Sequence, residues 1–293
     1  MKKIKKMLFV TKFAELGHDA LQSMLTLRNA ALEHVVFLYA IEREKVAMHR
    51  GLGYEKDEEV KLRETANIRF IDWAEGLFEQ GMEAGVYIEV GNMVPEVIKA
   101  ATEEKVDLIV VGKSHKGILE QLYSGSDVLE LIQRTSIPVQ VFKHSPDKVS
   151  LIENPFERPL LATDWSPASQ KAVEYLKGFK NIAQEIHIVH AVNEKDLKRT
   201  SAYEVQEIRK EARKKMEDIE EILESEGIKT RSHVYVGEPV QEIEKAAKEY
   251  QASMIILGSS GKESWTDRLL GGIPQKIAEK SIYHTLLIPP DTQ

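Results

Sequence analysis

The sequence of 293 residues contains no cysteine. This absence excludes disulfide bonds, thiolate zinc sites, iron–sulfur clusters and cysteine nucleophiles, and it favours a cytoplasmic location. Long apolar runs are also missing: Leu108–Val111 and Met254–Leu257 are far below the ~18 residues that a membrane helix needs. The apolar stretch before Lys12 is too short for a signal-peptide core. We therefore expect no contact with a membrane.

Positive charge is scarce relative to negative charge. The chain has 40 Lys and Arg residues against 47 Asp and Glu residues, a formal net charge of −7. This balance argues against a nucleic-acid-binding surface, so we expect no nucleic-acid partner. The 42% of hydrophobic residues is enough for a sizeable core, which excludes the disordered and fibrous classes. The length predicts roughly two domains.

The two halves of the chain repeat one another. Residues 86–112 align without gaps on residues 232–258, an offset of 258 − 112 = 146, and 10 of the 27 aligned positions are identical. The identities include Gly91 with Gly237 and Glu96 with Glu242. A domain-sized period predicts a duplicated domain rather than a solenoid of short repeats. We expect domains at 1–144 and 159–293, joined by the proline-containing, polar linker 145–158.

Strand and helix patterns alternate in each half. In the second half, Ser166 and Pro167 are typical of a helix start, and Gly227 of a helix end. The strands expected in the second half are 160–163, 186–192, 230–236, 254–257 and 285–288, and those in the first half are 7–11, 34–41, 86–90, 107–111 and 138–142. This alternation predicts α/β domains, each a five-stranded parallel sheet with helices on both faces. Ligands bind such sheets beyond the carboxyl ends of the strands.

Glycines are concentrated after the fourth strand of the second half. Gly258, Gly261 and Gly271 follow the pattern G-x2-G-x9-G, and Gly272 stands just before the next helix. Glycines let the backbone approach a ligand, and free N–H groups at a helix start suit phosphate. The alternative interpretation is that they are ordinary turn glycines.

This loop, together with the stretch LLATDWSPAS at 160–169, resembles the universal stress protein family. The resemblance covers nearly the whole chain and implies two tandem Rossmann-like domains of the adenine nucleotide alpha hydrolase-like type, with strand order 3-2-1-4-5. It also implies a stress-response or signalling protein that binds an adenine nucleotide (ATP, ADP or AMP), with Mg²⁺ possible.

By this resemblance, Asp164 and the end of the second strand would contact adenine, Gly258 and Gly271 would lie along the ribose, and Gly261 and Gly272 would hold phosphate. The residues expected at the site are Ala162, Thr163, Asp164, Ala191, Val192, Leu257, Gly258, Ser260, Gly261, Lys262, Gly271, Gly272 and Ile273. The family has Ser or Thr where this chain has Gly272, so a mono- or diphosphate is expected to suit the site as well as ATP does.

The first half departs further from the family pattern. Gly112, Gly125 and Ser126 match it, but His115 replaces the second glycine and Lys12 replaces the aspartate. Because a lysine cannot accept a hydrogen bond from the adenine amino group, we expect weak nucleotide binding or none in this half. The alternative is that Lys12, Lys113 and His115 hold phosphate in a different pose.

No residue is predicted to be catalytic, and no metal site is predicted. His187 and His190 lie on one expected strand, where residues three apart point to opposite faces. Two other functions stay open: a slow ATPase or nucleotide-processing enzyme in the same cleft, and a non-binding dimerisation scaffold. The resemblance implies that the domains meet as a pseudo-dimer through strands 139–142 and 285–288, which would cover two sheet edges, and that the chain forms a homodimer.

Overall fold

The computed structural model describes residues 3–13, 17–47, 54–114, 125–144, 154–197, 201–259 and 272–290. The strands of the first half are β1 (Lys6–Val10), β2 (His34–Ile41), β3 (Glu83–Val90), β4 (Leu108–Ser114) and β5 (Val139–His144). Those of the second half are β6 (Pro159–Ala162), β7 (Ile186–Asn193), β8 (Thr230–Gly237), β9 (Met254–Gly258) and β10 (His284–Ile288).

Helices follow the strands in both halves. The first half has α1 (His18–Met24), α2 (Lys56–Glu79), α3 (Met93–Glu103) and α4 (Gly125–Arg134), with 3₁₀ turns η1 (Leu25–Ala30) and η2 (Arg43–Lys45). The second half has α5 (Pro167–Leu176), η3 (Lys177–Phe179), α6 (Glu194–Leu197), α7 (Ala202–Ser225), α8 (Pro239–Glu249) and α9 (Ile273–Lys280). Ser166 caps α5, as predicted, by accepting a hydrogen bond from the backbone N–H of Ser169 at 3.2 Å.

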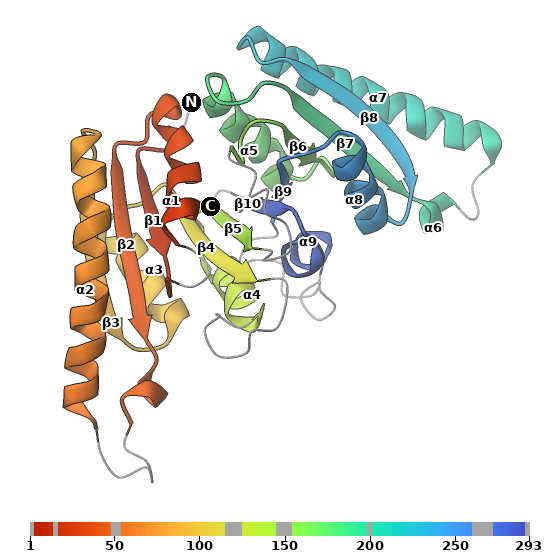
Figure 1. The fold of residues 1–293 in the computed structure, drawn as a ribbon. Coiled ribbons are helices and arrows are strands. Elements are labelled where there is room, and N and C mark those ends of the chain that lie inside the picture. Colours follow the sequence, from red (N-terminus) through yellow and green to blue (C-terminus); the bar gives the residue numbers. More distant parts are fainter. Residues whose placement is uncertain are drawn as a thin grey trace.

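The ten strands form one sheet in the order β3-β2-β1-β4-β5-β10-β9-β6-β7-β8 (Figure 1). Within each half the neighbouring strands are parallel and the order is 3-2-1-4-5, which confirms the predicted fold class. The halves join through β5 and β10, which pair antiparallel with Leu286 opposite Gln140. The family resemblance implied this join through the last strand of each half.

The strand boundaries differ from the predicted ones at a few ends. β3 begins at Glu83, three residues before the predicted start, because it pairs with β2 along its whole length from Glu83 opposite His34 to Val90 opposite Ile41. β4 continues beyond the predicted end at Val111 to Ser114 because its pairing with β5 also continues. In both cases the extra residues are polar or small, so the hydrophobic pattern did not reveal them.

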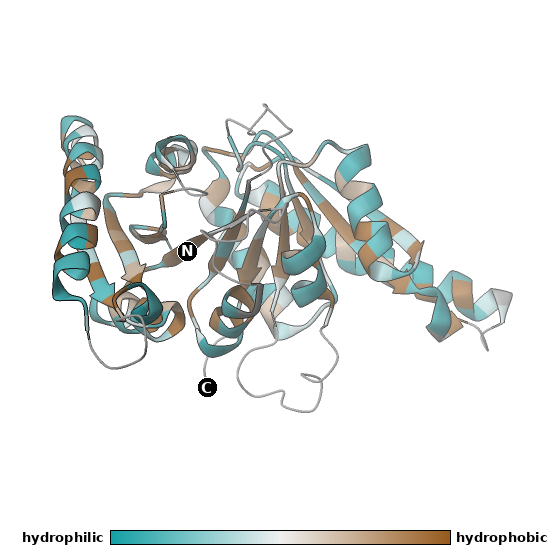
Figure 2. Cartoon of the chain, turned by 60° about the horizontal axis from the view of Figure 1, so that its bottom comes forward, coloured by the Kyte–Doolittle hydropathy of each residue, from teal (hydrophilic) through white to brown (hydrophobic). Residues whose placement is uncertain are grey.

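Two hydrophobic cores cover the two faces of the sheet, and each extends through both halves. One lies under α1, α2, α5 and α7 and includes Phe70 and Met216; the other lies under α3, α4, α8 and α9 and includes Val97 and Ile243. Figure 2 shows the apolar strands in the middle of the molecule and helices that carry hydrophilic residues around them. A parallel sheet buried on both sides explains the nearly continuous apolar runs of its strands.

A pair of identities in the repeat has a packing explanation. A Cβ atom added to Gly91 would lie 2.6 Å from the carboxylate Oε1 of Glu96, and one added to Gly237 would lie 2.6 Å from Oε1 of Glu242. Gly91 directly follows β3 and Gly237 is the last residue of β8, and each glutamate lies in the first turn of the next helix. The same close contact therefore turns the chain in both copies.

The join between the halves buries an unusual polar pair. The backbone N–H of Lys143 in β5 donates a hydrogen bond to Nδ1 of His284 in β10 at 3.0 Å, and the ring of His284 lies 4.2 Å from that of Phe142. Because Nδ1 accepts this bond, the imidazole is neutral. Burial, reinforced by the charge of Lys143, lowers the pKa of His284 to about 4.

This pair makes the fold sensitive to acid. The pKa of His284 is about 4 in the folded chain and 6.5 as the ordinary value, so the unfolded state binds a proton first as the pH falls. The contribution of neutral His284 to the free energy of unfolding is complete above pH 6.5. It is lost between pH 6.5 and pH 4, at about 1.4 kcal/mol per pH unit. His284→Asn keeps an acceptor near the position of Nδ1 but does not titrate. Urea unfolding should therefore show that wild type loses stability relative to His284→Asn as the pH falls from 6.5 to 4. Parallel stability profiles of the two proteins over this pH range would contradict the role of His284.

Candidate functional site

The turn after β6 fixes the geometry of the predicted cleft. Trp165 adopts a left-handed backbone conformation with φ +66°, which is rare for a bulky side chain and costs about 1–3 kcal/mol. Its N–H donates to Oγ1 of Thr163 at 3.3 Å, and its ring packs against the ring of His190 with centroids 4.7 Å apart. Lys215 of α7 lies over the same ring at 5.7 Å. These contacts hold the strained turn.

A cavity opens at the carboxyl ends of β6, β7 and β9, where the strand order predicts a ligand site. Seven of the expected residues line it: Ala162, Thr163, Asp164, Ala191, Leu257, Gly258 and Ile273. Sequence reasoning missed five others: Val189, His190, Pro239, Ile243 and Pro274. Three of these five belong to the first residues of α8 and α9, which follow strands three and four of the half and pack on this face of the sheet. The missed signal was therefore the position of these helices after their strands.

The cavity is small, with a volume of about 60 Å³. Sites that enclose a drug-sized ligand usually measure about 300–1,000 Å³. A ligand as large as a nucleotide can therefore place only one part in this cavity, with the remainder along its open edge.

Asp164 lies exposed at the rim of the cavity. Its Oδ1 accepts hydrogen bonds from the backbone N–H of Ser166 at 3.0 Å and from the Ser166 hydroxyl at 2.6 Å. These bonds fix the orientation of the carboxylate. Oδ2 has no hydrogen-bond partner among the described residues, and it is available to accept a bond from a ligand.

His190 belongs to the cavity lining, but its ring packs against Trp165 on the other face of the sheet. Its Nδ1 lies 2.8 Å from the carbonyl oxygen of Thr163, which can only accept, so Nδ1 carries the proton. Burial lowers the pKa of His190 against the opposing effects of this bond and of Asp164. The ring is therefore neutral at pH 7 and has a lone pair on Nε2.

Gly258 is required by packing. A Cβ atom at this position would overlap the backbone N of Ser169 and would lie 2.6 Å from the carbonyl carbon of Ala168, both in α5. Contacts this close do not occur for real side chains, and a helix backbone cannot yield as a flexible side chain can. The end of β9 and the start of α5 can approach so closely only because residue 258 is glycine.

The other expected residues of this half lie elsewhere or outside the described part of the chain. Val192 is nearly buried in β7, opposite Val236, and does not line the cavity. The N–H of Gly272, expected to face phosphate, donates to Oε1 of Gln275 at 3.1 Å. The residues that lie outside the described part are Ser260, Gly261, Lys262 and Gly271.

Among the described residues of the first half, those matched to the family pattern are not gathered in one pocket. Lys12 pairs with Glu42 and lines a pocket with side chains of β2 and α2. Gly112 lies in β4 opposite Phe142, and the pocket lining does not include it. Gly125 and Ser126 form the start of α4, and His115 lies outside the described residues.

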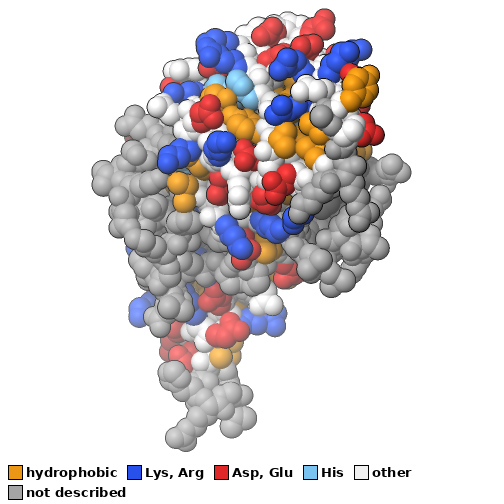
Figure 3. Space-filling model, turned by 90° about the vertical axis from the view of Figure 1, so that its right-hand side faces the viewer, with side chains coloured by type: hydrophobic (Ala, Val, Ile, Leu, Met, Phe, Trp, Pro, Cys, Tyr) orange, Lys and Arg blue, Asp and Glu red, His pale blue; other side chains and the backbone are white. Residues whose placement is uncertain are grey.

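The predicted separation of His187 and His190 is confirmed, because their rings pack on opposite faces of the sheet. His187 stacks on Tyr250, which follows α8, at 4.5 Å, whereas His190 packs on Trp165. Within the described residues, no group of three or more His, Asp or Glu side chains could hold a metal ion, and no helix is long and apolar enough to cross a membrane. Figure 3 shows acidic and basic side chains interspersed on one face of the molecule.

Comparison with known proteins points to a single family. The model of the universal stress protein family matches residues 3–143 and 155–289. Universal stress protein MJ0577 of Methanocaldococcus jannaschii is 28% identical over 153 residues, 45% of this chain and 94% of that protein. The crystal structure of a universal stress protein from Archaeoglobus fulgidus shares the fold: it is 23% identical with a TM-score of 0.74 and covers 99% of this chain and 100% of its own. A universal stress protein in complex with cAMP is 20% identical over 46% of this chain and 98% of its own, with a TM-score of 0.36, too low to bear on the ligand.

The close packing around Gly258 leads to a testable prediction, for which Gly76 serves as the control position. Gly258→Ala should lower the free energy of unfolding by about 1–3 kcal/mol, because the added methyl group pushes α5 away from β9. Gly76 lies inside α2 with nothing within 4 Å of an added Cβ, so Gly76→Ala should raise stability by about 0.5–1 kcal/mol. Urea unfolding of both variants measures the difference. If Gly258→Ala were as stable as wild type, the glycine would not be needed for packing.

Proposed function

The chain belongs to the universal stress protein family, and from that premise we propose that its second half binds an adenine nucleotide as part of a stress-response or signalling function. The observation that carries the proposal is the convergence of residues from three strand ends and the start of α9 on one cavity. These residues include Asp164, with one carboxylate oxygen already oriented by Ser166 and the other free of partners among the described residues.

The cavity suits the base of the nucleotide better than its phosphates. Ile243, Leu257 and Ile273 supply apolar walls, which favour a flat aromatic ring. The carboxylate of Asp164 accepts hydrogen bonds only, which matches the exocyclic amino group of adenine. With the base seated in the small cavity, the ribose and phosphates would follow its open edge toward the start of α9.

The phosphate end of the site is expected to discriminate little among AMP, ADP and ATP. A helix start favours an anion, and α9 begins beside the cavity. Gly272 brings no hydroxyl, and its N–H already donates to Gln275. AMP, ADP and ATP are therefore expected to bind with similar affinity, with no strong requirement for Mg²⁺.

The first half is proposed to contribute structure rather than a second adenine site. Lys12, at the position of Asp164, cannot accept a hydrogen bond from adenine, and its side chain is turned to Glu42. The boundaries 1–144 and 159–293, formation of a homodimer and a cytoplasmic location stay predictions from the sequence.

A non-binding scaffold is the second candidate function. The observation in its favour is that the packing of α5 accounts for Gly258 without any ligand. A slow ATPase in the same cleft is the enzymatic alternative.

The decisive experiment is titration calorimetry of the full chain with AMP and with IMP, in which an oxygen replaces the adenine amino group. Wild type should prefer AMP, because Oδ2 of Asp164 accepts from the amino group. Asp164→Asn keeps Oδ1 for Ser166 but presents a donor to the base, so AMP affinity should fall about tenfold and the preference for AMP should vanish or reverse.

Three other outcomes would redirect the proposal. An unchanged ratio of AMP to IMP affinity in Asp164→Asn would remove Asp164 from base recognition. No binding of AMP, ADP or ATP by wild type, together with no co-purified nucleotide, would support the scaffold. Turnover of ATP with Mg²⁺ that Asp164→Asn abolishes would support the enzyme.

A further inference from the structure

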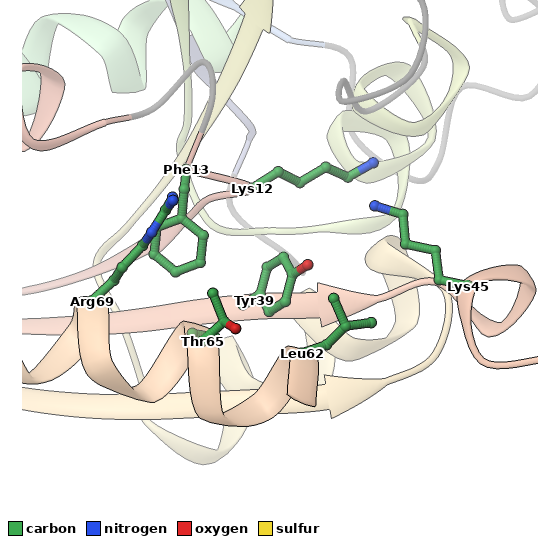
Figure 4. A pocket seen from close by; sticks show the side chains of 8 residues that line it. Lys12, Phe13, Tyr39, Lys45, Leu62, Thr65 and Arg69 are labelled. Atoms are coloured by element: carbon green, nitrogen blue, oxygen red, sulfur yellow. The ribbon is translucent and has the colours of Figure 1, made fainter. Parts of the chain in front are cut away.

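A second pocket lies in the first half, on the opposite face of the sheet from the face that the adenine cleft occupies in the second half. It has a volume of about 390 Å³. Its walls come from the end of β1, from β2, from η2 and from α2 (Figure 4): Lys12, Phe13, Tyr39, Lys45, Leu62, Thr65, Ala66 and Arg69. Tyr39 and Ala66 belong to the core on the α2 face, which places the pocket there.

Three cations surround this pocket. Figure 4 shows the amino groups of Lys12 and Lys45 at the same end, and the guanidinium of Arg69 at the other end beside Phe13. Arg69 lies over the ring of Phe13, 4.9 Å from its centroid. Glu42 neutralises part of this charge by pairing with the buried Lys12. Even with this pair counted, the pocket has an excess of positive charge in a protein whose net charge is −7.

In the second half, a carboxylate neutralises the cation that corresponds to Arg69. Arg69 and Lys215 correspond, since 215 − 69 = 146, and both cover the aromatic residue that follows the first strand of their half. Lys215 forms an ion pair with Glu211, one turn earlier, at 2.8 Å. The residue one turn before Arg69 is Thr65, whose hydroxyl donates to its own helix. Arg69 accordingly has no carboxylate partner among the described residues, so its charge is available to a ligand.

A neutral donor completes the pocket. The hydroxyl of Tyr39 is directed toward the end that holds the two lysines (Figure 4), and it has no hydrogen-bond partner among the described residues. Burial, together with the charge of Glu42, raises the pKa of Tyr39, so the hydroxyl keeps its proton and donates. Cations and a hydroxyl donor at one end of an aromatic wall are complementary to an anion attached to an organic body.

We propose that this pocket binds a small phosphate monoester, with its phosphate between Lys12 and Lys45 and its organic body along the ring of Tyr39. A phosphate group offers oxygens to several donors at once, which matches the two amino groups and the hydroxyl. Arg69 meets a second acceptor of the ligand at the far end. A volume of about 390 Å³ admits a molecule of the size of a phosphorylated ring compound. The site uses none of the residues proposed for adenine recognition.

Phenyl phosphate is the probe, since it carries a phosphate and a ring but has no adenine. Calorimetric titration of the full chain should show saturable binding, and binding of phenol and of inorganic phosphate should be weaker. Lys45→Gln should weaken the binding of phenyl phosphate about tenfold, because it removes a charged donor from the phosphate. Arg69→Gln should change this affinity less, because phenyl phosphate carries no acceptor at the end of the pocket where Arg69 lies. Lys61→Gln, which removes one exposed charge from the same helix outside the pocket, should change the affinity by less than about twofold.

Each contrary result overturns a definite part of the proposal. No saturable binding of phenyl phosphate, or an equal loss in Lys61→Gln, would overturn the site itself. Equal affinity for phenol would overturn recognition of the phosphate, and equal affinity for inorganic phosphate would overturn recognition of the organic body. Loss of phenyl phosphate binding in Asp164→Asn would place the probe in the second-half cleft. Unchanged thermal unfolding of Lys45→Gln and Arg69→Gln confirms that these variants fold.

Discussion

A bulky residue in a left-handed turn, directly after the first strand of each half, is the constraint on which both pockets depend. Phe13 has φ +68° and Trp165 has φ +66°, and each N–H donates to the threonine two residues earlier. Such a conformation persists only where the surroundings enforce it. Here the ring packs on a ring of the second strand, Tyr39 or His190, and lies under a cation of the long helix. The turn thereby sets where the chain leaves the sheet.

Antiparallel pairing of the two last strands explains why one chain holds both copies. Each half alone would expose β5 or β10 as an open sheet edge, which invites uncontrolled association. Pairing of equivalent strands in opposite directions is the arrangement that a two-fold axis produces, so the halves are related as subunits of a symmetric dimer are. The buried side chains of His284 and Phe142 place this join in the interior of the sheet.

The sequence predicted the duplication, the strand order through the family resemblance, and the edge of the sheet at which the cavity lies. The sequence could not tell whether Gly258 is needed for ligand binding or for packing. Gly258 matches a ligand-binding pattern, but the backbone of α5 leaves no room for a side chain at this position. It also could not place Trp165, since nothing in local pattern favours a left-handed conformation for a bulky aromatic residue. The convergence of Lys45 and Arg69 on one pocket depends on contacts between distant segments, which periodicity does not report.

Substitutions at equivalent positions give the two halves different arrangements of charge on one scaffold. Lys12 and Asp164 occupy the same place after the first strand, but Lys12 turns to the pocket beneath α2, whereas Asp164 turns to the cavity beside α9. Thr65 stands where Glu211 stands in the other copy, which leaves the cation of one long helix available and pairs that of the other. Because the backbone turn is held by rings in both copies, these charges could diverge without disturbing the fold. In the two proposals, one half keeps an acceptor for a base while the other gathers donors for an anion.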